Sequence, residues 1–571
     1  MVFAKLKTVG KRELSLLGVM FGALAFWTFN RVANINPAIL QDEFIYTYSS
    51  RRIGFWDQAP AYDFGNYLFN VIYSSTLFCG DAFYTCGKVL NLIFFSGFVF
   101  VLFLIALRFL NFWWALGVAA AVYLSPVSVY VSMYLPESLY FFLISCSVLL
   151  VVLALESDSW RNWLVAGAFL GAAGLAKPHA LISLMAFGLF IFIYSIGKRP
   201  FFKPLLVRGF SVLGGYLAIR VGLGFLLAGP KSLNVFGAYG ASTGVGELVG
   251  TVATGSVQET TTLVGAGPVE GALGLFPLQL LTHGYTLVAL LGAAIATLML
   301  VTIRIAAKGE ATPKEAFALF VLIWLGVMVI SIVLFTGWIT GQGDDHTTRV
   351  LLRYYDFLFP IVALAAVVMV VDPAFRSAPA WQRWLGVALP AVLATSAFTG
   401  FFATLTIQIA DAPNLAGFVV DKFVADGVGI LGFIALLIIA FYPGLAKYGV
   451  AGFLAFSLIL GGWQAQGQYK YFREADSASD VAGMLLRKEL TDLERSQTVI
   501  IANSRFDARV ASLWMDSNND LILRGEETPI LDGEIPGSYK YALILGNHET
   551  SVEYPVTING DGFKLIEIGL D

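Results

Sequence analysis

The sequence predicts a polytopic α-helical membrane protein with about thirteen transmembrane helices and a small C-terminal α/β or α+β domain. Of its 571 residues, 57% are hydrophobic and only 13% are charged, whereas an ordinary soluble domain is about one quarter charged. Apolar runs that approach the ~20 residues needed to cross a bilayer recur through residues 1–463. Charged residues and short strand-like segments take over in residues 464–571, which predicts a separate soluble domain there.

Each long apolar run is predicted to be a helix, because an isolated strand leaves its backbone groups unpaired in lipid. The predicted helices cover residues 14–33, 88–108, 112–132, 137–155, 162–176, 180–196, 209–228, 283–306, 315–338, 355–371, 384–404, 427–442 and 447–463. With a cytoplasmic N-terminus, Lys and Arg are more frequent in the inner loops than in the outer ones, as the positive-inside rule expects. We therefore expect residues 34–87, residues 229–282 and the tail to lie on the outer side of a bacterial inner membrane.

The predicted soluble domain begins with a helix at residues 478–493. Its strands are predicted at residues 498–502, 520–523, 541–545 and 563–568. The domain carries no convincing nucleotide-binding fingerprint, and a net charge of -3 gives no indication of a nucleic-acid partner.

The outer loops contain three further features. Residues 64–75 have apolar side chains at helical spacing, which is typical of a helix lying in the membrane interface. Residues 237–274 are rich in Gly, Ser, Thr and Val, and the sequence leaves open whether they form a lid over a ligand or a passive loop. Cys79 and Cys86 can form a disulfide in an oxidising compartment, whereas Cys146 in an apolar helix is expected to be a packing residue.

Acidic residues stand at two of the predicted outer helix ends. Asp42 and Glu43 follow the first helix in an apolar and aromatic setting, where solvated interface charges are the alternative to a functional site. Glu137 follows Pro136 at the outer start of the fourth helix, where a cap on the helix dipole is an equally valid interpretation.

Basic residues are expected at the same outer face. Arg349 and Arg353 are four residues apart, so a helix would place both on one face, where they would suit a phosphate or, alternatively, local acids and lipid headgroups. Lys177 precedes a proline and His179 between two apolar runs, and its alternative is a snorkelling lysine. Arg220 lies within an apolar helix, where an arginine is costly and therefore a functional candidate.

Four of these short motifs together resemble a known family. They are the acidic pair Asp42-Glu43, the Pro-Glu at Glu137, the Lys-Pro turn at Lys177 and the Arg-Tyr-Tyr that starts at Arg353. In this combination the chain resembles the integral membrane glycosyltransferases of the GT-C class. The resemblance is nearest to bacterial enzymes that use a polyprenyl-phosphate-linked sugar, such as lipid A aminoarabinose transferases, protein mannosyltransferases and arabinofuranosyltransferases.

The resemblance implies an inverting transfer of a sugar from a polyprenyl-phosphate carrier to a hydroxyl group of an envelope glycan, lipid or protein. A carboxylate must take the proton of that hydroxyl, for which we expect Asp42 first and Glu43 second. The leaving phosphate needs cations, and the candidates are Arg353, Arg349, Lys177 and Arg220. Further contacts to substrate are expected from Glu137, His179, Tyr354, Tyr46, Asp345 and His346.

A divalent metal is the open question for this chemistry, because some relatives in the GT-C class use one. Asp344, Asp345 and His346 carry suitable atoms, but adjacent residues seldom all reach one ion. We therefore expect a metal-independent reaction that requires no cofactor.

Two other functional classes fit a chain with this many helices. A transporter or lipid flippase is the main alternative, although such proteins often show internal repeats and place polar groups near the bilayer midplane. No obvious repeat is present here, and the unusual charges gather at the outer face. A noncatalytic assembly or carbohydrate-binding protein would need far fewer helices as its anchor.

Overall fold

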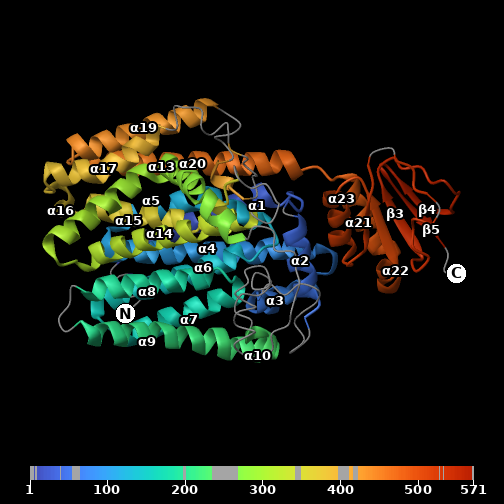
Figure 1. Ribbon diagram of the computed structural model, residues 1–571, viewed down its shortest axis with the longest axis horizontal. Coiled ribbons are helices and arrows are strands. Elements are labelled where there is room, and N and C mark those ends of the chain that lie inside the picture. Colours follow the sequence, from blue (N-terminus) through green and yellow to red (C-terminus); the bar gives the residue numbers. More distant parts are fainter. Residues whose placement is uncertain are drawn as a thin grey trace.

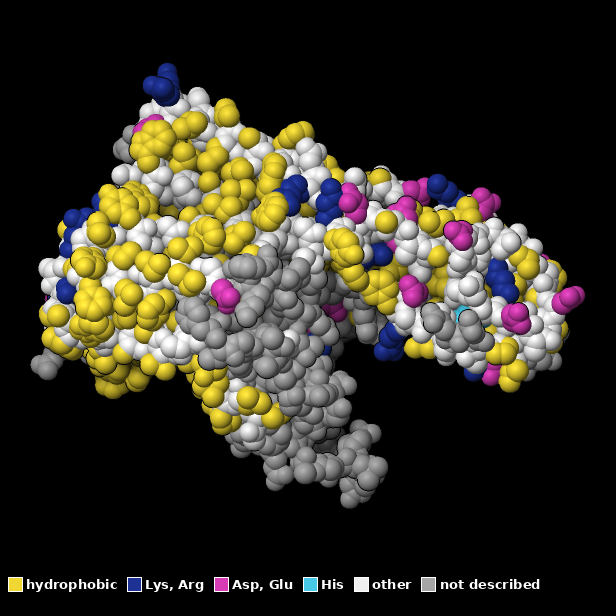
Figure 2. Space-filling model, turned by 90° about the horizontal axis from the view of Figure 1, so that it is seen from above, with side chains coloured by type: hydrophobic (Ala, Val, Ile, Leu, Met, Phe, Trp, Pro, Cys, Tyr) yellow, Lys and Arg dark blue, Asp and Glu magenta, His cyan; other side chains and the backbone are white. Residues whose placement is uncertain are grey.

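A computed structural model describes residues 6, 9–38, 40–53, 65–196, 201–233, 268–340, 349–395, 405, 411–415, 422–525, 528–531 and 533–568. It consists of a bundle of long helices with a small domain of helices and strands at one end (Figure 1). Large apolar side chains are exposed over the helical bundle, among them Phe26, Trp113 and Phe202, and Figure 2 shows them spread across its surface. Charged side chains are concentrated on the small domain, so the bundle presents the surface expected of a part that lies in lipid (Figure 2).

The predicted helices are found, and the structure divides some of them. In the first half of the bundle the helices are α1 (Lys11–Val32), α2 (Leu40–Arg51), α3 (Tyr67–Tyr73), η2 (Ser74–Ala82), α4 (Phe83–Phe109), α5 (Phe112–Tyr123), η3 (Pro126–Ser132), α6 (Glu137–Ser157), α7 (Trp160–Ala176) and α8 (Ala180–Ile196). In the second half they are α9 (Phe202–Leu217), the π-helix η4 (Ala218–Leu223), α10 (Gly224–Ala228), η5 (Gly229–Leu233), α13 (Pro268–Lys308), α14 (Pro313–Thr340), η6 (Leu352–Tyr354), α15 (Leu358–Val371), α16 (Pro373–Arg376), α17 (Ala380–Ala394), η9 (Pro413–Leu415), α19 (Lys422–Phe441) and α20 (Ala446–Arg473).

The described residues account for part of the predicted crossings. Among them, eight helices are long and apolar enough to cross a membrane, or nine if the bent pair of α5 and η3 forms one span. The other predicted spans are α7, α8, α15 and α17, whose described helices have 17, 17, 14 and 15 residues. The chain is a multi-pass membrane protein, and the total of thirteen crossings stays a prediction.

Close packing of small residues joins α9 to α7. A Cβ atom at Gly167 would lie 2.0 Å from the carbonyl oxygen of Val212, and one at Gly215 would lie 1.9 Å from that of Leu164. Only glycine permits the two helix backbones to approach this closely, as is common between helices in membranes. This contact fixes the path of α9 and of the π-helix η4 that continues it.

The small domain follows α20 directly. It contains α21 (Ala478–Glu489), α22 (Asp492–Ser496), β1 (Thr498–Ala502), α23 (Arg505–Met515), β2 (Leu521–Leu523), β3 (Tyr541–Leu545), β4 (Val556–Gly560) and β5 (Phe563–Glu567). The predicted mixed domain is therefore confirmed, with β1 and β3 at the predicted residues. The boundary predicted at residue 464 falls inside α20, which continues to Arg473 because no residue in that stretch breaks the helix.

The five strands form one mixed sheet in the order β2-β1-β3-β5-β4. The inner strand β1 is parallel to β2 and to β3, with Ile500 paired to Leu521 on one side and to Leu543 on the other. The last two strands are antiparallel, β5 to β3 and β4 to β5. All five residues of β1 and of β3 are buried, as expected of strands covered on both faces.

The small domain is docked on one end of the bundle through aromatic and charged contacts. The Trp514 ring of α23 lies 5.7 Å from the Phe83 ring and 5.5 Å from the Tyr84 ring, both at the start of α4. Arg473 at the end of α20 donates to both carboxylate oxygens of Asp480, at 2.9 and 3.0 Å, and to the carbonyl of Pro37 at 2.7 Å. These contacts tie the domain to the segment that leads into α2.

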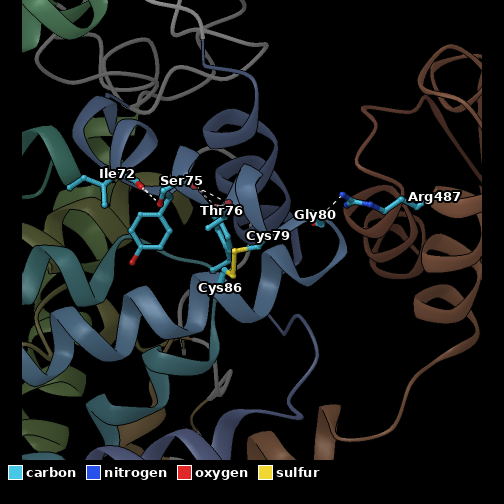
Figure 3. Close-up of a disulfide and its surroundings, with 9 residues drawn as sticks. Ile72, Ser75, Thr76, Cys79, Gly80, Cys86 and Arg487 are labelled. Atoms are coloured by element: carbon cyan, nitrogen blue, oxygen red, sulfur yellow. Dashed lines mark hydrogen bonds between the residues drawn. A yellow bond between two sulfur atoms is a disulfide. The ribbon is translucent and has the colours of Figure 1, made fainter.

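A disulfide closes the segment between α3 and α4. Cys79 and Cys86 are bonded, as the sequence permitted (Figure 3). Cys146, within α6, is reduced and half-buried. Next to the bridge, Arg487 of the small domain donates to the Gly80 carbonyl at 3.4 Å (Figure 3). Arg487 also pairs with Asp81 at 3.0 Å. The bridge therefore lies where the bundle meets the small domain.

Candidate active site

The position of α2 is set by a buried lysine that the sequence reasoning did not single out. The ammonium group of Lys88, in α4, donates to the carbonyls of Val32, Ala33 and Ile35 at 3.0, 2.8 and 2.6 Å. These carbonyls belong to the end of α1 and the residues after it, which have no partners within the helix. Lys88 thereby fixes the turn that leads from α1 into α2, and its only sequence signal is a charge at the start of an apolar run.

Glu43 is fully buried and holds three segments together. One carboxylate oxygen accepts from the backbone N–H of Ala38 at 2.7 Å. The other accepts from the Tyr84 hydroxyl at 2.5 Å and from the backbone N–H of Tyr134 at 2.8 Å. A carboxylate that accepts this many bonds from the protein is suited to positioning its helix. Its neighbour Asp42 has the more accessible carboxylate of the predicted pair.

Asp42 stands on the first turn of α2 and pairs with Arg353. Its Oδ2 atom accepts from Arg353 Nη1 at 2.8 Å, and 40% of its side chain is exposed. Arg353 also donates through Nε to Glu137 Oε1 at 2.7 Å. Lys177 donates to that same Glu137 oxygen at 2.9 Å. Four predicted site residues from four separate segments therefore form one chain of ion pairs, in which Asp42 is the most exposed member.

The two ends of this chain of ion pairs, Asp42 and Lys177, differ in their access to water. The side chain of Glu137 is fully buried and those of Lys177 and Arg353 are 5% and 9% exposed. Burial alone would lower the pKa of Arg353, but the carboxylates of Glu137 and Asp42 raise that pKa well above its ordinary value. Arg353 is therefore a permanent cation between two acids.

Glu137 begins α6, as the cap interpretation expects. It lies in the first turn of the helix, where a negative charge interacts favourably with the helix dipole. The same carboxylate binds Arg353 and Lys177, so Arg353 pairs with acids of the chain, which is one of its two alternatives, and contact of these residues with a substrate stays a prediction. Helix α7 ends just before Lys177, because Pro178 cannot continue a helix.

Aromatic side chains surround the cations. The rings of His179 and Tyr354 are stacked with centroids 4.6 Å apart, and Lys177 lies 5.6 Å from the Tyr354 ring centroid. Burial, followed by the charge of Lys177, lowers the pKa of His179 well below its usual value, so this imidazole is neutral. Burial and the carboxylates of Asp42 and Glu137 raise the pKa of Tyr46 well above its usual value, which keeps the phenol protonated.

Arg349 pairs with an acid that the sequence reasoning missed. Its Nε atom donates to Asp411 Oδ2 at 2.7 Å, and the Asp411 carbonyl accepts from the backbone N–H of Arg353 at 2.7 Å. Asp411 thus links the two arginines, one through its side chain and the other through its backbone. Nothing in the sequence around residue 411 marks it, because its role depends on a contact across 62 residues.

Arg220 lies in the π-helix η4 and is buried. Its Nη1 atom donates to the Ser232 carbonyl at 2.9 Å, and its Nη2 atom lies 3.7 Å from the position of a Cβ at Gly65. These two contacts of Arg220 are with η5 and with a residue two positions before α3, whereas Arg353 contacts Asp42 and Glu137. A π-helical turn is frequent at functional sites, so Arg220 keeps its place as a candidate.

A third fully buried acid, after Glu43 and Glu137, lies close to this region. Asp356, just before α15, accepts from the Tyr130 hydroxyl at 2.5 Å and is fully buried. Only its position three residues after Arg353 hinted at it in the sequence. It supports the turn that holds η6. Because the Asp356 side chain is fully buried, a substrate cannot reach it.

The proposed metal ligands cannot be placed. Asp344, Asp345 and His346 lie outside the described residues. Among the residues that are described, no three His, Cys, Asp or Glu side chains come close enough together to hold one ion. Whether the reaction needs a metal therefore stays a prediction.

The arrangement combines a half-exposed carboxylate with cations that can bind an anion. Arg353 uses Nε and Nη1 for its two carboxylate partners, and its Nη2 group has no hydrogen bond within the described part of the chain. The chain of charges is neutral overall, because two acids balance two cations. Neutralising Asp42 would leave one positive charge in excess at Arg353.

Comparisons with other proteins place these features in context. No protein-family model matches the sequence, and no curated protein matches it. Three solved structures have a similar arrangement. ArnT from Cupriavidus metallidurans bound to undecaprenyl phosphate is 13% identical, with 96% of this chain and 97% of that chain covered and a TM-score of 0.45.

The other two structures give similar values. The apo state of the same ArnT is 15% identical, with 97% and 98% covered and a TM-score of 0.44. The oligosaccharyltransferase from Archaeoglobus fulgidus is 12% identical, with 92% of this chain and 69% of that chain covered and a TM-score of 0.44. Because the identities and scores are low, the function proposed next rests on the residues of the site.

Proposed function

We propose that the protein is a GT-C-type glycosyltransferase that moves a sugar from a polyprenyl-phosphate carrier to a hydroxyl group of a cell-envelope acceptor. The observation that carries the proposal is the ion pair between Asp42 and Arg353, which brings a half-exposed carboxylate within 2.8 Å of a buried cation. The acceptor is a glycan, a lipid or a protein, and the reaction takes place at the outer face of a bacterial inner membrane. The C-terminal domain accordingly lies in the periplasm.

Asp42 is the general base of this reaction. The acceptor hydroxyl gives its proton to the Asp42 carboxylate as its oxygen forms a bond to the anomeric carbon. The bond between that carbon and the phosphate oxygen breaks, and the phosphate leaves with the electron pair. Attack from the side opposite the phosphate inverts the anomeric centre. The leaving phosphate is already a stable anion, so no acid is needed to protonate it.

Arg353 couples the proton transfer to Asp42 with the departure of the phosphate. Before transfer, its charge is balanced by Asp42 and Glu137. When Asp42 accepts the proton, its negative charge disappears and the Arg353 guanidinium becomes available to the phosphate that is leaving. Lys177 and Arg349 supply further positive charge, and Arg220 is the fourth candidate.

Glu137 keeps Arg353 and Lys177 in place throughout, whereas Glu43 positions α2. His179, Tyr354 and Tyr46 are candidates for contacts to the sugar, as are Asp345 and His346 in the undescribed segment.

The test compares wild type with Asp42→Asn in nanodiscs. Radiolabelled polyprenyl-phosphate sugars are supplied as donors, and a cell-envelope extract is supplied as acceptor. Loss of the base should slow transfer by about 100-fold or more, while binding of the carrier is retained. Glu474→Gln is the matched control, because Glu474 is an exposed acid that pairs only with Lys470 on its own helix among the contacts described for it.

Three results would count against the proposal. Equal transfer by wild type and Asp42→Asn would remove Asp42 as the base. An equal loss in Glu474→Gln would show that the assay reports a general effect of removing acids. No transfer by folded wild type with any donor would favour the transporter or flippase, whose substrate uptake into proteoliposomes is then measured.

A further inference from the structure

A polar cavity lies at the edge of the C-terminal sheet. Its volume is about 460 Å³, which is within the range of about 300–1,000 Å³ typical of ligand pockets. The residues that line it come from the start of α21, the ends of β1 and β3, the first turn of α23 and the turn between β4 and β5: Ser477, Ala478, Ser479, Asn503, Asp507, Leu545, Gly546, Asn547 and Gly562.

The topology of the sheet explains why a cavity forms there. From β1 the chain crosses through α23 to β2 on one side, while β3 lies on the other side of β1. The connections leave the carboxyl ends of these parallel strands in opposite directions, which opens a crevice where open α/β sheets commonly bind ligands. Asn503 directly follows β1, and Asn547 lies two residues after β3.

Glycine permits the walls of the cavity to come together. Gly546 has φ +94°, and a Cβ atom there would lie 3.2 Å from the Asn503 amide. Its backbone N–H donates to the Gly562 carbonyl at 2.9 Å, which joins the end of β3 to the turn before β5. The cavity is therefore bounded by ordered backbone on this side.

The polar groups of the cavity have unused hydrogen-bonding capacity. The side-chain amides of Asn503 and Asn547 are exposed and make no hydrogen bond to any part of the chain that the structure describes. Asp507 accepts from Ser504 at 2.6 Å and from Ser479 at 3.2 Å, and a carboxylate can accept about four bonds in all. Two amides and one carboxylate thus face the same space with donors and acceptors to spare.

The charges of the cavity disfavour an anion. Among the described residues of the lining, Asp507 is the only ionisable side chain. Both helix starts are capped by the protein itself, because Ser477 accepts from the backbone N–H of Asp480 and Ser504 accepts from that of Asp507. A phosphate would therefore meet a carboxylate and two occupied helix ends. A neutral ligand with many hydroxyl groups would find acceptors at Asp507 and both donors and acceptors at the amides.

We infer that this cavity binds an uncharged, hydroxyl-rich ligand, namely a neutral sugar unit of a glycan. The inference does not depend on the reaction proposed for Asp42, because the cavity is built entirely by the C-terminal domain. It gives that domain a role in holding a glycan at the outer surface.

Binding is tested with the full chain in nanodiscs and an array of fluorescently labelled neutral oligosaccharides, with sulfated and phosphorylated oligosaccharides in the same array. The Asn503→Ala/Asn547→Ala double variant should weaken the binding of a neutral oligosaccharide at least tenfold. Neither amide makes an internal bond in the described chain, so the variant should keep the melting temperature of wild type. Asn518→Ala, at the other end of α23, is the control and should bind as wild type.

The outcomes separate this inference from the proposed transfer. Asp42→Asn should bind the neutral oligosaccharide as wild type does, even where transfer is lost. Unchanged binding in the Asn503→Ala/Asn547→Ala variant, preference for the phosphorylated or sulfated oligosaccharides, or no saccharide bound by folded wild type would each overturn the inference. A failure of transfer with any donor would leave this binding result unaffected.

Discussion

Arg52 at the end of α2 donates to Asp516 at the end of α23 with a distance of 2.9 Å between Nη1 and Oδ1. Arg51 pairs with the same carboxylate at 3.2 Å and lies over the Phe83 ring. The helix that carries Asp42 is therefore held at its far end by the C-terminal domain. A chain that merely tethered a soluble domain would not need this contact.

Removing this contact should slow transfer without unfolding the protein. Asp516 has φ 55°, a left-handed conformation that asparagine adopts readily, so Asp516→Asn keeps the turn and removes the charge. We expect kcat to fall by up to about 100-fold, because a small displacement of α2 moves Asp42 away from the acceptor. Initial rates at saturating donor measure the effect.

The control for this variant is Asp492→Asn. Asp492 also pairs with an arginine, but Arg495 lies three residues away within the small domain. The kcat of Asp492→Asn should match that of wild type. A normal kcat in Asp516→Asn would show that the contact to α23 is unnecessary for holding α2.

Glu137→Gln should destabilise the protein strongly. The substitution leaves Arg353 and Lys177 buried beside each other with no shared carboxylate, and breaking a buried pair in this way costs about 3–5 kcal/mol. The melting temperature in detergent, followed by intrinsic fluorescence, should fall clearly. Glu156→Gln removes a partly exposed partner of Arg108 and should cost at most about 1 kcal/mol. Similar melting temperatures for the two variants would contradict the structural role of Glu137.

The Cys79–Cys86 disulfide should contribute to stability. The two cysteines are seven residues apart, and closing so short a loop stabilises the folded state by about 2–3 kcal/mol in the chain-entropy model. Treatment with dithiothreitol should therefore lower the melting temperature of wild type. It should have no effect on Cys79→Ser/Cys86→Ser, which should melt at the lower temperature from the start. Labelling of three thiols in untreated, denatured wild type would show that the bridge is not formed.

Chelation of divalent metals should leave transfer unchanged. In the proposed reaction the charge of the leaving phosphate is balanced by Arg353, Lys177 and Arg349, so no step requires an ion. Initial rates are measured in EDTA and after adding Mg²⁺ or Mn²⁺. A loss of activity in EDTA that either ion restores would indicate a metal site, for which Asp344, Asp345 and His346 are the first residues to substitute.

Much of the fold follows from local sequence. Long apolar runs must be helices in lipid, so residues 88–108 and 137–155 identify α4 and α6 without any knowledge of their neighbours. In the tail, β1 and β3 are short apolar runs between polar turns, which is a local signal as well. Helix length was a poorer guide, because α20 continues through polar residues to Arg473, whereas the apolar run predicts its end at residue 463.

The sequence predicted several residues of the candidate site but not which of them contact one another. A charge is rare in an apolar chain, so the sequence by itself identified Asp42, Glu137, Lys177 and Arg353 as unusual. Only the tertiary structure decided that Arg353 contacts Asp42 across 311 positions, that Glu43 is enclosed by Tyr84 and Tyr134, and that Lys88 and Asp411 support the site. Hydrophobicity and helix-breaking residues act over a few positions and can be read along the chain, whereas the pairing of charges depends on which helices pack together.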